Sequence, residues 1–238
     1  MNVLILDFES TGLDTKLDRP IEIGILVLDT LANSPLYITN MFPYAGQTIS
    51  SEITELTGIT TQLLEEHGVI PVVCFNDLIA TISKYNVQYL VAHNGTSFDF
   101  PLLANELARL GIAMPEIGYI DTRTDLPHKK EPRSKDLASL CFKYGYGSIA
   151  NHRAVFDCIS VFQLLQNFDF EEVAALSKIP MICVRAMISY EDRQLGKDKG
   201  FSWERAGDKH YPKCWIKNIK ANSVEALQKS CSFQVVVL

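Results

Sequence analysis

The N-terminal region contains two apolar segments of strand length, separated by a short polar turn. Val3–Phe8 is apolar except for Asp7, and Ile21–Leu28 is rich in β-branched residues, which favour extended structure. Thr11–Asp14 supplies turn residues between them, and Leu36–Phe42 is a third strand-like segment. Three strands with short connections predict an antiparallel meander. A sheet is therefore the centre of the predicted fold.

Helical patterns follow the meander and alternate with two further strand-like segments. The predicted helices include 72–84, 101–110, 134–142, 153–167 and 170–177, and the predicted strands are 88–92 and 117–120. Gly111 lies just beyond one of these helices, where glycine commonly ends a helix. A meander followed by alternating strands and helices predicts the α/β class, with a mixed five-stranded sheet flanked by helices.

The composition changes near Pro180. Residues 182–238 carry ten Lys and Arg against six Asp and Glu, whereas the rest of the chain carries twelve against twenty-two. We therefore predict a first domain at 1–178 and a small basic, aromatic-rich C-terminal module at 181–238. Its rings and charges interleave, which suits nucleic-acid binding, although the tryptophans of a small fold also serve as its core. These residues are Phe201, Trp203, Lys209, His210, Tyr211, Lys213, Trp215, Lys217 and Lys220.

The remaining bulk properties exclude several classes. No apolar run reaches the roughly 18 residues that a membrane span requires, and the first residues have neither a basic region nor a cleavage site. We therefore expect a cytoplasmic protein without membrane contact. The six cysteines are scattered and lack the spacing of a zinc site, so we expect reduced thiols.

Several carboxylates stand where an ordinary core would not place them. Asp7 and Glu9 are two residues apart on a strand, so they project to the same face. Asp99 follows the 88–92 strand, and His152 precedes Asp157 by five residues. Each pattern alone fits surface acids or helix caps. Together they fit a site that holds two divalent cations through carboxylate oxygens, with histidine as a base that titrates near neutral pH.

Three motifs carry a resemblance to the DEDDh exonuclease family. Asp7-Phe-Glu9 resembles its first motif, Asn94 to Asp99 its second, and His152-x-Ala-x-x-Asp157 its third. The segment 90–103 is similar to the second motif of exonucleases of the three-prime repair type. This likeness covers roughly residues 1–175 and implies a ribonuclease H-like fold. The C-terminal module faintly resembles that of bacterial exonuclease X.

The resemblance implies a role for each position in the motifs. Asp7, Glu9 and Asp157 would bind one cation, and Asp7 and Asp99 a second, with Mg²⁺ or Mn²⁺ as the ions. His152 would be the catalytic base, and Glu9 would also accept a hydrogen bond from the terminal 3′-hydroxyl. The residues implied in substrate binding are Thr11, Gly12, Leu13, Ile59 and Asn94. Core packing is the alternative for Leu13 and Ile59, and turn capping for Asn94. His93 is expected to be a structural hydrogen bonder.

The implied activity is a 3′→5′ exonuclease that releases nucleoside 5′-monophosphates from DNA 3′ ends, with single strands preferred. RNA is the alternative substrate, through an RNA-trimming or polymerase-proofreading enzyme of the same family. A partner subunit that binds nucleic acid without cleaving it is a third alternative. The oligomeric state stays open, with a homodimer among the alternatives.

Overall fold

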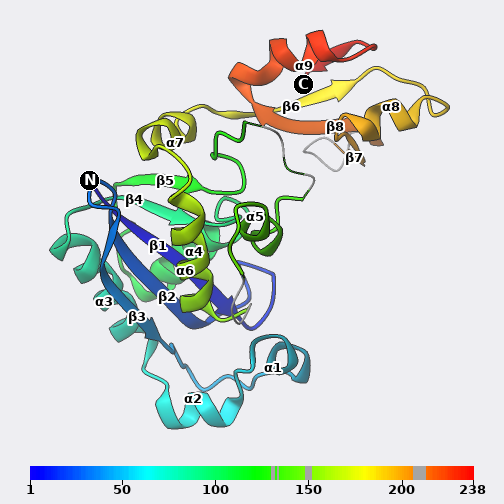
Figure 1. Ribbon diagram of the computed structural model, residues 1–238. Helices are drawn as coiled ribbons and strands as arrows, with labels where there is room; N and C mark the ends of the chain where they lie inside the picture. Colours follow the sequence, from blue (N-terminus) through cyan, green and yellow to red (C-terminus); the bar gives the residue numbers. More distant parts are fainter. Residues whose placement is uncertain (130–131, 133, 148–151, 206–212) are drawn as a thin grey trace. The chain divides into compact units, whose positions relative to one another are not determined.

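The computed structural model describes residues 1–129, 132, 134–147, 152–205 and 213–238 (Figure 1). The chain consists of two compact units, Met1–Ser177 and Lys178–Leu238. No helix in the described part of the chain is both long enough and apolar enough to cross a bilayer. All six cysteines are free thiols.

The first unit is built on a mixed five-stranded sheet in the order β3-β2-β1-β4-β5. The first three strands form the predicted antiparallel meander, and β4 and β5 run parallel to β1. This sheet, flanked by helices, confirms the predicted fold class. The strands are β1 (Asn2–Ser10), β2 (Pro20–Asp29), β3 (Ser34–Met41), β4 (Val87–Ala92) and β5 (Gly118–Asp121).

Seven helices are described in this unit, and several end where local chemistry favours it. The Ser50 side chain accepts a hydrogen bond from the Ile53 backbone and caps α1, and Gly58 ends that helix with a left-handed φ of 73°. Gly111 ends α4 in the same way, as predicted. The helices are α1 (Ser51–Thr57), α2 (Thr61–His67), α3 (Pro71–Lys84), α4 (Asp99–Leu110), α5 (Leu137–Lys143), α6 (Ala154–Leu165) and α7 (Phe170–Ser177).

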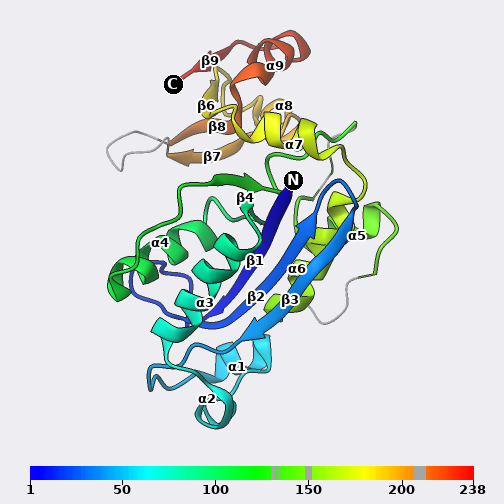
Figure 2. The ribbon, with the colours of Figure 1, turned by 90° about the vertical axis from the view of Figure 1, so that its left-hand side faces the viewer.

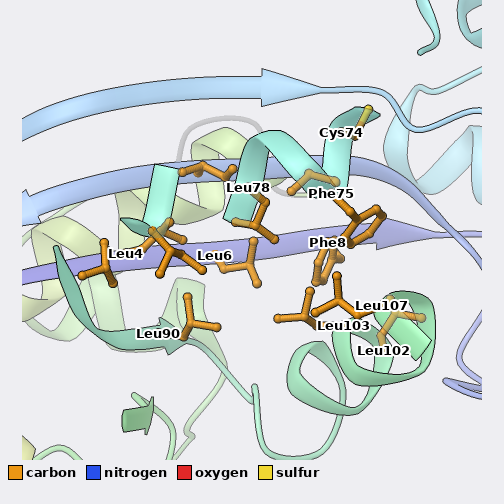
Figure 3. Packing of buried hydrophobic residues seen from close by; sticks show 14 of the residues in the cluster. Leu4, Leu6, Phe8, Cys74, Phe75, Leu78, Leu90, Leu102, Leu103 and Leu107 are labelled. Carbon is orange, nitrogen blue, oxygen red and sulfur yellow. The ribbon is translucent and has the colours of Figure 1, made fainter. Parts of the chain in front are cut away.

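Helices cover both faces of the sheet, and β1 contributes side chains to both cores. Leu4, Leu6 and Phe8 pack against α3 and α4 on one face (Figures 2 and 3). Val3 and Ile5 pack against α6 and its neighbours on the other face. Because strand side chains alternate, this second face is also the one to which Asp7 and Glu9 belong.

The second unit contains a four-stranded antiparallel sheet in the order β7-β8-β6-β9. Trp215 is buried in its core with Val184, Ala186, Phe201 and Val235. The predicted basic and aromatic residues Lys209, His210 and Tyr211 lie outside the described residues. The elements are β6 (Met181–Ala186), α8 (Arg193–Asp198), β7 (Ser202–Arg205), β8 (Lys213–Lys220), the short 3₁₀ helix Ala221–Ser223, α9 (Val224–Ser230) and β9 (Val235–Val237).

Candidate active site

Three carboxylates converge at the end of β1. Asp7 pairs with Gly24 across the sheet and Glu9 pairs with Glu22, so all four share the face covered by α6. One oxygen from each of Asp7, Glu9 and Asp157 lies within 4.8 Å of the others. The structure thus brings together residues that are up to 150 positions apart in the sequence.

Asp157 reaches this group because α6 approaches β2 very closely. A Cβ atom on Gly24 would lie 2.3 Å from the backbone carbon of Ala154, which is closer than any real side chain tolerates. Glycine at this position therefore allows the first turn of α6 to rest on the sheet. That contact sets the depth at which Asp157 enters the site.

Glu22 fixes the same helical turn through its side chain, and the sequence did not single it out. Its carboxylate is fully buried and accepts hydrogen bonds from Arg153 Nη2 at 2.8 Å and from the Ala154 backbone N–H at 2.9 Å. Asn40 donates to it from β3 at 2.7 Å. The signal was the same as for Asp7, namely an acid inside an apolar strand.

Asp99 lies in the same cleft but not in the group of three. It is the first residue of α4, is 3% exposed, and accepts a hydrogen bond from the Phe8 backbone N–H at 3.1 Å. This bond ties the start of α4 to the β1 residue between Asp7 and Glu9. Asp99 is therefore held beside the three clustered carboxylates without being one of them.

His152 stands immediately before α6 at the border of the cleft. It has a φ of 62°, a left-handed conformation that residues other than glycine rarely adopt. Its backbone N–H donates to Asp157 Oδ2 at 3.1 Å, and its side chain is exposed. Such local strain persists where surrounding contacts hold it, and it often marks functional positions.

Burial and mutual repulsion disturb the titration of all four acids. Burial, followed by the charges of Asp99, Asp157, Glu9 and Glu22, raises the pKa of Asp7 well above its usual range. Burial, followed by the charges of Asp157, Glu22 and Asp99, raises the pKa of Glu9 to about 8. Burial raises the pKa of Asp99 to about 7. Burial also raises the pKa of Asp157. A cation would relieve this repulsion, so the donor set fits a hard divalent ion.

The carboxylates line a cleft of about 850 Å³, within the size range of small-ligand sites. Gly12 and Leu13 line it, together with Ile53 and Leu56 of α1. Leu13 is 87% exposed and Leu56 is 51% exposed, so both offer apolar surface to a ligand.

Two residues predicted to bind substrate lie elsewhere. Ile59 is fully buried in a small core with Ile21, Ile49 and Leu64, because the turn after α1 directs it inward. The prediction of a base contact for Ile59 is therefore corrected, and Leu56 of α1 is the exposed apolar residue at the cleft. Thr11 is not among the lining residues; its hydroxyl donates to Asp18 at 2.8 Å and accepts from the Arg19 backbone.

The loop before α4 is organised by Asp121, a second buried acid that the sequence did not single out. Asp121 ends β5 and accepts hydrogen bonds from the backbone N–H groups of Asn94 and Thr96. Asn94 has a left-handed φ of 66° and lines the cleft. His93 bonds to Thr122 and to the Lys135 carbonyl, each at 2.9 Å, which is the structural role expected for it.

The sheet order and the position of the carboxylates at the end of the central strand define a ribonuclease H-like fold with an acidic site. A family model described as "Exonuclease" matches residues 4–165. The chain therefore belongs to the exonuclease family, and its predicted resemblance to DEDDh exonucleases is confirmed. A second model, a "Domain of unknown function (DUF8626)", matches residues 182–238.

Curated relatives share the first unit. A "DNA polymerase III PolC-type" of Thermotoga petrophila is 32% identical over 165 residues, which cover 69% of this chain and 12% of the relative. "Three-prime repair exonuclease 1" of Homo sapiens is 33% identical over 139 residues, covering 51% of this chain and 43% of the relative. The chain thus spans about an eighth of the polymerase relative and less than half of the repair exonuclease.

Solved structures show the same fold at low sequence identity. The nuclease domain of 3′hExo, a DEDDh family member, bound to rAMP has a TM-score of 0.59 at 19% identity, covering 70% of this chain and 92% of that chain. E. coli exonuclease I in complex with a dA16 oligonucleotide has a TM-score of 0.63 at 14% identity, covering 98% of this chain and 68% of that chain.

Proposed function

We propose that this chain is a metal-dependent 3′→5′ exonuclease that releases nucleoside 5′-monophosphates from DNA 3′ ends, with single strands preferred. The observation that carries the proposal is the group of three carboxylates, Asp7, Glu9 and Asp157, within 4.8 Å of one another on the wall of a cleft. A phosphodiester is itself an anion, so these carboxylates admit it only with cations between them.

The four carboxylates would share the binding of two cations. Asp7, Glu9 and Asp157 would hold one divalent ion, and Asp7 and Asp99 would hold the second, as the family resemblance implies. Mg²⁺ and Mn²⁺ are the ions that hard carboxylate oxygens favour. When bound, such ions stabilise the charge that develops on the phosphoryl oxygens and on the leaving 3′-oxygen.

The protein's own groups supply the proton transfer and the positioning. His152 takes the proton from the attacking water. Its backbone hydrogen bond to Asp157 keeps the base and this carboxylate close to each other. Glu9 accepts a hydrogen bond from the terminal 3′-hydroxyl, which distinguishes an end from the middle of a strand. Gly12 allows close approach of the terminal nucleotide, and Leu13 and Leu56 contact its base. Asn94 positions the scissile strand.

A second candidate is proofreading, and the polymerase relatives favour it. They match the chain over 165 residues at 32% identity, a wider match than that of the repair exonuclease. The chemistry in the cleft is the same for both candidates. They differ in whether the chain acts alone or beside a polymerase, so mispaired primer ends should be removed faster than paired ends if proofreading is the role.

A single-strand degradation assay tests the proposal. A 5′-labelled DNA strand with Mg²⁺ or Mn²⁺ should shorten from its 3′ end in steps of one nucleotide, and the released product should be a nucleoside 5′-monophosphate. Asp7→Ala should lower the rate by about 100-fold or more. Glu65→Ala, which removes an exposed acid of α2, is the matched control and should leave the rate unchanged.

Two outcomes would contradict the proposal: internal fragments as first products, or activity that survives Asp7→Ala. Matched DNA and RNA strands in the same assay decide the polymer, because discrimination depends on contacts to the 2′-hydroxyl. Calorimetric titration with Mn²⁺ separates an enzyme from a non-cleaving partner subunit, because the partner subunit need not bind two cations.

A further inference from the structure

The second unit contains a half-exposed tryptophan on an edge strand. Trp203 lies on β7 at the edge of the sheet and is 47% exposed, whereas its cross-strand partner Trp215 is 4% exposed. Their ring centroids are 5.4 Å apart at an angle of 59°. Trp215 therefore packs against Trp203 from the core side. The Trp203 indole is held in place by this contact, while much of its surface is exposed to water.

Cationic side chains surround this ring on the same side of the sheet. Lys213, Trp215 and Lys217 alternate along β8, so the two lysines share the face of the tryptophans. Lys213 is exposed, and Lys217 Nζ donates to the Lys199 carbonyl at 2.9 Å. The aromatic surface thus lies between two lysines of one strand.

Helix α8 packs against the buried tryptophan and carries cationic residues of its own. Its Gly196 packs on the Trp215 ring, where an added Cβ would lie 3.7 Å from ring carbons. The next residue, Lys197, is exposed. At the start of the helix, the Arg193 guanidinium lies 4.6 Å from the ring centre of Tyr190, which is 68% exposed. A second exposed ring with a cation therefore borders the helix.

Acids also lie near α8, because Glu191 and Asp192 precede it and Asp198 ends it. Glu204 follows Trp203 directly on β7 and so belongs to the opposite face of the sheet. Asp198 accepts a hydrogen bond from Gln194, and Asp192 accepts one from Ser189. Residues 178–238 carry eleven Lys and Arg against six Asp and Glu. The second unit as a whole therefore carries a positive balance of five charges.

We propose that Trp203, with Lys213 on the neighbouring strand, forms a binding site for single-stranded nucleic acid in the C-terminal module. A flat ring accepts any base by stacking, and the surrounding cations neutralise the phosphates on either side. A protein partner would favour an apolar patch without so many cations. The role of this site rests on the proposed exonuclease function, because the site would hold a strand that the enzyme is shortening.

Tryptophan fluorescence gives a direct measurement, because Trp203 and Trp215 are the two tryptophans of the chain. The full chain is titrated, in a chelator that prevents cleavage, with an oligothymidylate of about 12 nucleotides, within the span of known single-strand sites. We expect quenching of the exposed indole by stacked bases. An abasic strand with the same number of phosphates should bind more weakly and quench much less.

Variants separate stacking from charge and from folding. Trp203→Ala should weaken oligothymidylate binding by about 10-fold, as expected for one stacked base. Trp203→Phe keeps a ring, so binding to a labelled strand should persist while the quenching disappears. Lys213→Ala should weaken binding and lower the slope of log affinity against log salt by about one. Lys229→Ala is the matched control, because Lys229 lies on α9 in an ion pair with Glu225.

Three results would overturn the site: equal binding of the abasic strand, quenching that persists in Trp203→Phe, or normal affinity in Trp203→Ala with native Trp215 emission. Turnover of a dinucleotide by the unmodified chain with Mg²⁺ reports the cleft alone. Dinucleotide cleavage without quenching by the oligothymidylate would contradict the C-terminal site and support the exonuclease function. Quenching without dinucleotide cleavage would support the C-terminal site and contradict the exonuclease function.

Discussion

At the scale of single residues, the site buries four carboxyl groups close together, which disfavours their ionised forms. Asp7, Glu9, Asp99 and Asp157 have raised pKa values because burial and neighbouring carboxylates disfavour ionisation. A site of this kind costs stability when empty of cations, and bound cations recover that stability.

Stability should therefore depend on pH and metal in a definite direction. The pKa of Glu9 is about 8 in the folded chain against an ordinary 4.5, so the folded chain holds this proton to higher pH. Its contribution to the free energy of unfolding in chelator thus falls as pH rises through that window. Urea unfolding at about pH 5 and about pH 8 should show a smaller fall for Glu9→Gln than for the wild type. Mg²⁺ should reduce this fall. A free energy of unfolding of the metal-free wild type that rises from pH 5 to pH 8 would contradict the prediction.

Glu22 is expected to act through the helix that it holds. Glu22→Gln removes the charge that faces Arg153 and loosens the first turn of α6, which carries Asp157. We predict that kcat falls by about 10-fold or more while KM for a short strand changes little, because a small displacement of catalytic groups is costly. Steady-state kinetics on a labelled strand measure both constants.

Glu106 offers the matched comparison. Glu106 is equally buried and forms ion pairs with Arg19 and Arg109. Arg109 donates a hydrogen bond to the Asp18 carbonyl, in the loop between β1 and β2, so this group holds that loop and not α6. Glu106→Gln should therefore lower the free energy of unfolding by about as much as Glu22→Gln does, about 1–3 kcal/mol, and leave kcat unchanged. Equal loss of kcat in both variants would mean that Glu22 has only a structural role.

At the scale of elements, the close contact between α6 and β2 decides where the third motif lies. Gly24→Ala places a methyl group where the α6 backbone now stands, so the helix must move outward. Overpacking of this kind costs about 1–3 kcal/mol, and activity should fall further than stability does. Thermal unfolding and turnover measure the two effects. Gly147→Ala is the control, because its added Cβ would lie within 4 Å of no atom in the described part of the chain.

Element types were largely predictable, because hydrophobic periodicity reports burial directly. The meander and the five strands were predicted, as were α3, α4, α6 and α7 to within a few residues. Helix boundaries were less accurate. The helix predicted at 134–142 begins at Leu137, since Asp136 caps it by accepting the Ser139 N–H at 2.8 Å. Such caps depend on local geometry that several polar residues could satisfy.

At the scale of the whole molecule, the chain combines an acidic unit and a basic unit with separate hydrophobic cores. A truncated chain that ends at Ser177 should therefore fold, keep dinucleotide turnover and lose affinity for long strands. Its binding should also depend less on salt, because fewer phosphates are neutralised. Circular dichroism checks the fold and salt-dependent titration checks the binding. Unchanged affinity for long strands would assign binding to the first unit alone.

The pattern of strands, the shared face of Asp7 and Glu9, and the order of the motifs could all be derived from the amino-acid sequence. These follow from alternation along a strand and from residue types, which are local properties. Three features required the folded structure: the ion pair of Glu22 with Arg153, the hydrogen bonds of Asp121 to the Asn94 loop, and the burial of Ile59 while Leu56 is exposed. Those outcomes depend on contacts between distant segments, and burial is set by what packs against a residue rather than by its own identity.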